Sequence, residues 1–173
     1  MRYTLVVGVF LLCFGNASAQ YNVKSESIMD VSISVYGSGL GASLGYGYII
    51  NREAKLAVYV GSAYGKIHAA TYNPIFLEGK MMYKVNGDTR TSVALFNVVG
   101  GVVIQYDRII SGLELADSEA KSSVNFGFGL GAEIEIKMTN RAYLYGSGMQ
   151  KYFIKEDFGR WRYQISAGLR FVI

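Results

Sequence analysis

Apolar and polar residues alternate most regularly over the last fourteen residues of the chain, RWRYQISAGLRFVI. The apolar positions, every second one, are Trp161, Tyr163, Ile165, Ala167, Leu169, Phe171 and Ile173. The intervening positions are polar or small and include Arg160, Arg162 and Arg170. Because a β-strand points successive side chains to opposite faces, this stretch predicts a strand with one apolar face and one polar face.

The same kind of pattern predicts seven further strands. They cover 28–36, 40–50, 55–64, 75–85, 91–106, 124–138 and 142–153. The most regular is 124–138, in which Phe126, Phe128 and Leu130 alternate with glycines that suit a narrow, strongly curved sheet. The stretch 91–106 is apolar at both sets of positions, so the pattern does not assign its faces.

The connections between these strands differ in length in a regular way. Those expected to be short are 51–54, 86–88 and 139–141, and those expected to be long are 65–74 and 107–123. The two others, 37–39 and 154–159, are brief and fall on the side of the long ones. Short periplasmic turns opposite longer external loops are typical of barrels in bacterial outer membranes.

We therefore predict an all-β fold, an eight-stranded antiparallel up-and-down transmembrane β-barrel over residues 28–173. Its polar face points inward and its apolar face toward lipid, which a closed barrel permits because every backbone group is paired. In 142–153 this places Tyr143, Tyr145, Met149 and Phe153 on the apolar face, opposite Gly146, Gly148 and Gln150. The alternative is a soluble lipocalin-like barrel in the periplasm, with the apolar face around a ligand. The aromatic residues at strand ends and the uneven loops favour the membrane barrel.

The N-terminal residues resemble a cleaved secretion signal. Arg2 precedes an apolar run over 5–14, and Ala17-Ser18-Ala19 predicts cleavage before Gln20. Residues 1–19 are thus assigned to a signal peptide and 20–27 to a flexible lead, and the protein to a bacterial outer membrane. Cys13, the only cysteine, lies in the signal, and Leu12 before it argues against a lipid anchor. The mature chain is then expected to have no disulfide, thiol nucleophile or cysteine metal site.

Composition agrees with a β-rich membrane protein and narrows the possible functions. The chain has 14 Tyr, 9 Phe and 21 Gly with a single Pro, which suits many strands, tight turns and aromatic girdles. Its net charge of +4 falls by one when Arg2 is removed with the signal. So mild a positive charge gives no reason to expect direct nucleic-acid binding.

Residues that could carry chemistry are few. His68 is the only histidine, and Ser62, Asp107 and Ser111 are the polar residues that could reach the same rim. No nucleophile motif accompanies them, so we predict that the protein is not an enzyme. With one His, no mature Cys and no ligand spacing among Glu114, Asp117 and Glu119, we also predict no metal and no other cofactor.

Charged residues on the inward set of positions form the one candidate site. They are Asp30, Glu78, Lys80, Lys84, Glu133, Glu135, Lys137, Arg160, Arg162 and Arg170. One reading is a charged conduit, and the other is a network of ion pairs that fills the interior. The second is favoured, because an eight-stranded barrel is only wide enough for its own side chains. Asp30 and Arg170 are expected to pair where the first and last strands meet.

The C-terminal half of the chain resembles a known family. Its glycine-rich FGFGLGAEIE, its turn Thr139-Asn140-Arg141 and its closing F-G-R-x-R-x-x-x-S-A-G-L-R-F are similar to the TraO-type conjugative-transposon proteins of Bacteroidetes, over about 76–173. The resemblance implies an outer-membrane component of a conjugative DNA-transfer apparatus that acts through other proteins of that assembly. The alternative is a stand-alone small barrel for adhesion, envelope stability or ligand binding at its loops. Outer-membrane lipid is an expected partner in both cases.

Overall fold

The computed structural model describes residues 26–37, 39–67, 70–86, 94–111, 123–154 and 160–173. Its strands are β1 (Ser27–Tyr36), β2 (Gly39–Ile49), β3 (Ala54–Ile67), β4 (Ala70–Asn86), β5 (Ala94–Ser111), β6 (Ser123–Lys137), β7 (Ala142–Phe153) and β8 (Trp161–Val172). Within these ranges, no helix has the length and apolar character needed to cross a membrane. The expected signal peptide lies outside the described residues.

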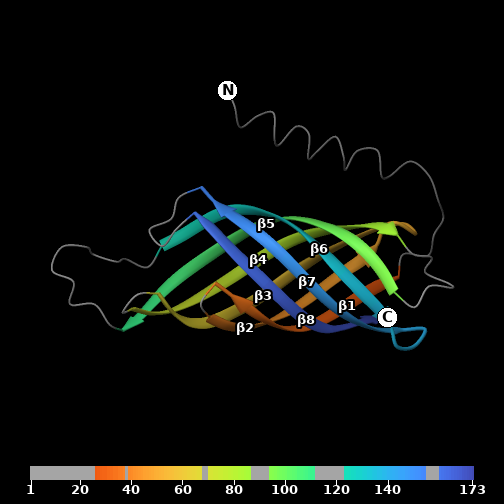
Figure 1. The fold of residues 1–173 in the computed structure, drawn as a ribbon, viewed down its shortest axis with the longest axis horizontal. Coiled ribbons are helices and arrows are strands. Elements are labelled where there is room, and N and C mark those ends of the chain that lie inside the picture. Colours follow the sequence, from red (N-terminus) through yellow and green to blue (C-terminus); the bar gives the residue numbers. More distant parts are fainter. Residues whose placement is uncertain (1–25, 38, 68–69, 87–93, 112–122, 155–159) are drawn as a thin grey trace, which may run out of the picture.

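The strands form a closed antiparallel barrel in chain order (Figure 1). Each strand pairs with its neighbours in sequence, and β1 closes the barrel by pairing with β8, from Ile28 opposite Val172 to Tyr36 opposite Gln164. The predicted fold class is confirmed. β1 therefore begins at the same end of the barrel at which β8 finishes.

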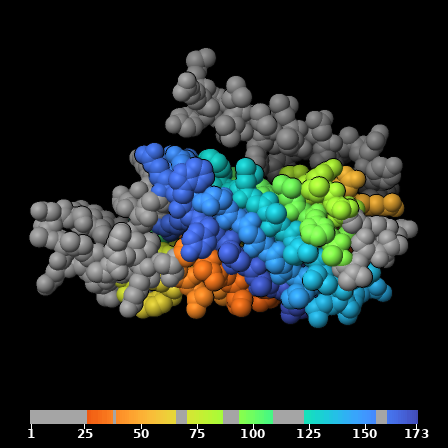
Figure 2. Space-filling view, viewed as in Figure 1, coloured from red at the N-terminus to blue at the C-terminus, as the bar shows by residue number. Residues whose placement is uncertain are grey.

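The outer surface of the barrel is apolar. Among its most exposed side chains are Ile33, at 71%, and Leu130, at 66%. In the space-filling view, β6, β7 and β8 lie side by side, in teal and blue, and form a continuous surface (Figure 2). The exposed apolar face is the one that the alternation in 28–36, 124–138 and 160–173 predicts.

The strands around β3, β4 and β5 are longer than the sequence pattern indicates. β3 and β4 stay paired up to Ile67 opposite Ala70, so the expected long loop over 65–74 is wrong for most of its length. Residues 107–111 likewise continue β5 instead of opening a loop. In these strands, backbone pairing continues beyond the last residues of the apolar face. The sequence there no longer alternates between apolar and polar residues, so it gives no sign of a strand. Of the expected turn 86–88, residues 87–88 lie outside the described residues, as do 112–122.

The orientation expected for 142–153 is also wrong. Tyr145, Met149 and Phe153 of β7 are buried inside the barrel, whereas Gly148 and Gln150 face outward. Large side chains are needed to fill the interior, and small residues are tolerated on the outer surface. The polarity of a single strand therefore does not fix its orientation.

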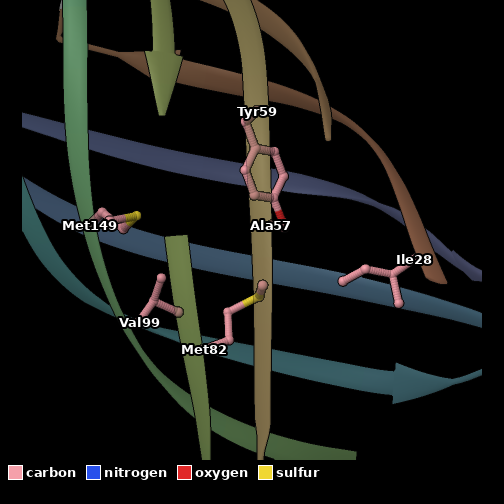
Figure 3. Close-up of a cluster of buried hydrophobic side chains, with 6 residues drawn as sticks. All are labelled: Ile28, Ala57, Tyr59, Met82, Val99 and Met149. Atoms are coloured by element: carbon pink, nitrogen blue, oxygen red, sulfur yellow. The ribbon is translucent and has the colours of Figure 1, made fainter. Parts of the chain in front are cut away.

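Apolar side chains fill the spaces between the inward charges. Ile28, Ala57, Tyr59, Met82, Val99 and Met149 form one such cluster (Figure 3). A second comprises Phe76, Val103 and Phe153. Val99 and Val103 settle the orientation of β5, the strand whose faces the sequence left open. Its inward positions mix these valines with Asn97 and Gln105.

Two glycines are required by local geometry. Gly37, between β1 and β2, has a φ of +55°, a conformation that residues with a Cβ rarely adopt. At Gly131 of β6, an added Cβ would lie 2.1 Å from the carbonyl oxygen of Gly148 on β7. The inward glycines of β6 thus allow the close strand approach that a narrow barrel needs.

Candidate functional site

Ionisable side chains are concentrated inside the barrel, where the described residues include equal numbers of anions and cations. The carboxylates are Asp30, Glu78, Asp107, Glu133 and Glu135. The cations are Lys55, Lys80, Lys151, Arg162 and Arg170. All are nearly or fully buried, and the most exposed is Lys55, whose side chain is 15% exposed. Such burial is tolerable only when opposite charges pair directly.

Arg170 is the centre of the largest group of charges. Its Nε and Nη2 donate to the two oxygens of Asp30, at 2.9 and 2.8 Å, in a bidentate pair between β8 and β1. Its Nη1 donates to Glu133 at 2.8 Å and also to Glu135, both on β6. Asp30 and Arg170 lie directly opposite each other, as expected from the sequence. That prediction is confirmed.

Neighbouring side chains complete the hydrogen bonds of this group. Lys55 of β3 pairs with Glu135 at 2.5 Å, and Asn97 donates to the same carboxylate at 2.7 Å. Tyr59 donates to Asp30, and the ring of Tyr145 lies 4.8 Å from the Arg170 guanidinium. Six of the eight strands therefore meet at one charged cluster, which fixes their register relative to one another.

Glu78 holds together a second group near the middle of the barrel. It pairs with Lys80 at 2.9 Å on its own strand, β4, and with Lys151 on β7. The Lys151 ammonium also lies over the rings of Tyr36 and Phe76, at 4.7 and 5.0 Å. Cation–π contacts of this kind stabilise a charge that has been removed from water.

Asp107 and Arg162 form a third group, close to the end where β5 finishes and β8 begins. Two guanidinium nitrogens lie 3.3 Å from the two carboxylate oxygens. Gln105 and Asn125 donate amide hydrogens to the same carboxylate, at 2.8 and 3.0 Å. Tyr36 in turn donates to Gln105. The three groups thus follow one another along the barrel axis.

Seven of the ten charged residues predicted for the interior lie there. They are Asp30, Glu78, Lys80, Glu133, Glu135, Arg162 and Arg170. Lys84 and Lys137 take inward positions near strand ends and are only half-buried. Arg160 is a correction, because it precedes β8 and its side chain is exposed. The alternation continues one residue beyond the strand, into the connection.

Three interior charges are not identified from the sequence. The apolar pattern places Asp107 in a loop, because β5 extends beyond its last apolar residue. Lys151 shares its face with Tyr145 and Phe153, on the strand whose orientation is the reverse of the expected one. Lys55 does follow the inward alternation of Ala57 and Tyr59, so a stricter reading of that stretch would have found it.

Little free space is left among these side chains. The cavity beside Lys80 and Glu133, which Ser32, Ser147 and Ser166 also line, measures about 10 Å³. This is room for about one water molecule. Among the described residues, no group of three or more His, Cys, Asp and Glu side chains is arranged to hold a metal ion.

The residues considered for chemistry do not come together in the described part of the chain. Ser62 faces outward from β3 and accepts a hydrogen bond from Asn73. Asp107 forms an ion pair with Arg162 inside the barrel. His68 and the acidic residues Glu114, Asp117 and Glu119 lie outside the described residues.

Comparison with known proteins finds resemblance in structure alone. No family model matches the chain, and no curated protein matches it in sequence. Neisserial surface protein A has a similar structure, with a TM-score of 0.65 and 16% identity over 86% of this chain and 97% of that one. A major outer membrane protein of Thermus thermophilus has a TM-score of 0.67 and 13% identity, over 87% and 100%. The outer membrane enzyme PagL has a TM-score of 0.52 and 14% identity, over 84% and 99%. The chain thus has the fold of small outer-membrane barrels.

Proposed function

We propose that this protein is a stand-alone, non-enzymatic outer-membrane barrel that conducts nothing and serves adhesion or envelope stability through one of its ends. The observation that carries the proposal is the contrast between the outer and the inner face of the barrel wall. Ile33, Leu130 and Ile165 are 60–71% exposed on the outside, while the inward charges are paired with one another. So large an apolar surface requires lipid or a partner around it.

Strand length indicates which end of the barrel would contact another surface. β4 and β5 contain 17 and 18 residues, whereas β1 and β8 contain 10 and 12. The extra length lies at the end opposite the start of β1, where it forms a raised wall on one side of the rim. A wall of paired backbone is more rigid than a loop, which suits contact with another surface.

The test measures both the insertion of the protein into membranes and its ion conductance. Unheated protein should migrate differently from heated protein on a denaturing gel, and it should be extracted from cells only with detergent. In planar lipid bilayers it should produce no discrete conductance steps. Recovery in a detergent-free soluble fraction would refute the membrane assignment, and stable conductance steps would refute the filled interior.

The fold alone does not decide against catalysis, because PagL, a neighbour in structure, is an enzyme. What supports a non-enzymatic role is that the inward carboxylates are bound to cations and amides on several strands. Incubation with phospholipid vesicles should leave the lipid composition unchanged. Release of free fatty acid would contradict this part of the proposal.

A role in conjugation is the second candidate, and it rests on the sequence resemblance over 76–173. A conjugation operon around the gene would support it, and deletion should then lower the frequency of plasmid or transposon transfer. Unchanged transfer after deletion would leave adhesion or envelope stability as the role.

A further inference from the structure

The outer surface of β3, β4 and β5 changes from apolar to polar at one level. Outward positions below it are apolar on all three strands and include Val58, Val60, Ile75, Leu77, Val102 and Ile104. At the level itself lie Ser62 of β3, Asn73 of β4 and Arg108 of β5. Asn73 lies opposite Arg108 in the strand pairing, and its amide donates to Ser62 at 2.8 Å. The three side chains therefore form a polar row across neighbouring strands.

Arg108 lies where lipid head groups would begin. It is exposed, and it follows Tyr106, which is 40% exposed and continues the outward column of Ile104. Tyr64 on β3 is 59% exposed on the same face. Tyrosines at this level mark the boundary between hydrocarbon and head groups in membrane barrels. In a barrel inserted in a membrane, the Arg108 guanidinium would thus lie at the depth of the phosphates.

The polar row has the hydrogen-bonding groups that a phosphate requires. A guanidinium binds phosphate oxygens through two parallel hydrogen bonds. The Ser62 hydroxyl accepts from Asn73, which leaves its own proton available to donate to a phosphate oxygen. The apolar column through Tyr106 and Ile104 lies directly below and would contact acyl chains.

The opposite end of the barrel differs in its charges. The exposed charged residues described there are of both signs, namely Glu26, Arg52, Glu53 and Arg141. They lie in or beside turns, and Glu53 already accepts a hydrogen bond from Tyr83. No comparable row with a lone cation crosses neighbouring strands among the described residues at that end.

We propose that Arg108 and Ser62 bind the phosphate of a lipid head group, with Tyr106 and Tyr64 beside the lipid. Asn73 positions the Ser62 hydroxyl, because its amide donates one hydrogen bond to Ser62 and another to the backbone oxygen of Ala63. The site rests on the proposed insertion in a membrane. It adds a fixed lipid contact on one side of the barrel, beneath the raised wall of β3, β4 and β5. A lipid held there would set both the depth and the tilt of the barrel.

The test measures lipid retained by the full-length protein in dodecyl maltoside micelles, by native mass spectrometry. The probes are phosphatidic acid and a diacylglycerol with the same acyl chains. Arg108→Gln should weaken binding of phosphatidic acid about tenfold, the loss typical of one charge-assisted contact, and leave diacylglycerol unchanged. Arg52→Gln, an exposed arginine of the opposite end, is the matched control and should bind as the unaltered protein does. Ser62→Ala should cause a smaller loss than Arg108→Gln.

Several outcomes would overturn the site. Arg108→Gln could bind phosphatidic acid as tightly as the unaltered protein, or Arg52→Gln could lose as much. Equal competition by free inorganic phosphate would indicate an anion site without lipid. Each variant is first checked for the heat-dependent gel shift, so that misfolding is recognised. Failure of the proposed function itself would be seen earlier, as protein that needs no detergent.

Discussion

At the scale of single residues, the interior depends on charges that are shielded from bulk water and rely on one another as partners. Arg170 contacts Asp30, Glu133 and Glu135, whereas Asp30 has Arg170 and Tyr59 as partners. Removing the arginine would therefore leave three carboxylates close together, but removing Asp30 would leave the arginine with two. The residues of one ion pair thus contribute unequally to stability.

For Asp30→Ala and Arg170→Ala, we expect each change to lower the free energy of unfolding by about 3–5 kcal/mol, with the arginine at the upper end. The double variant should lose less than the sum, because the two residues share a bidentate contact. Urea unfolding in lipid vesicles measures all three. Strictly additive losses would mean that the seam pair does not form.

Two glycines on neighbouring strands provide a second residue-scale prediction. Gly131→Ala should be strongly destabilising, because its Cβ would meet the backbone oxygen of Gly148 at 2.1 Å. Gly148→Ala is the matched control, since nothing lies within 4 Å of the new atom. It should be neutral or gain about 0.4–1 kcal/mol by restricting the unfolded chain. The same urea unfolding applies, and equal effects would contradict the register of β6 and β7.

At the scale of elements, each strand separates a lipid face from an interior face, but hydrophobicity identifies the faces unequally well. The pattern orients β6 and β8 correctly because their inward residues are mostly glycine, polar or charged. It fails for β7, because Tyr145, Met149 and Phe153 point inward with Lys151. An interior that holds cations also needs rings and thioethers to fill it, so apolar residues occur on both faces.

Leu130→Arg tests the outward face of β6. Leu130 is 66% exposed in the middle of the strand, where an arginine would enter hydrocarbon. We expect a loss of about 2–4 kcal/mol in lipid vesicles if the position is near the midplane. Leu130→Ala introduces no charge and should cost much less. A neutral Leu130→Arg would indicate that this face is not in lipid.

At the scale of the whole molecule, an even number of strands brings both ends of the barrel wall to one side. β1 and β8 meet with Ile28 opposite Val172, and the extended parts of β3, β4 and β5 lie at the other end. In the proposed orientation, the end with Arg52 and Arg141 faces the periplasm. The end with Arg108 and Arg160 faces the exterior.

This orientation can be tested with single cysteines, because Cys13 is the only one in the chain and lies in the expected signal. Arg160→Cys should react with a membrane-impermeant maleimide on intact cells, since the position is exposed at the proposed outer end. Arg52→Cys, exposed at the other end, should react only after lysis. The reverse pattern would invert the topology.

Alternation along the chain is enough to establish the number of strands, their order, the lipid face of most of them and the meeting of Asp30 with Arg170. This is because alternation is a local property, and closure of an up-and-down barrel leaves little choice of neighbours. The ends of β3, β4 and β5, the orientation of β7, and the places of Asp107 and Lys151 emerge only from the folded barrel. They depend on which strands face one another across the interior, and on how far backbone pairing continues beyond the part of the barrel that contacts lipid. No short stretch of sequence contains that information.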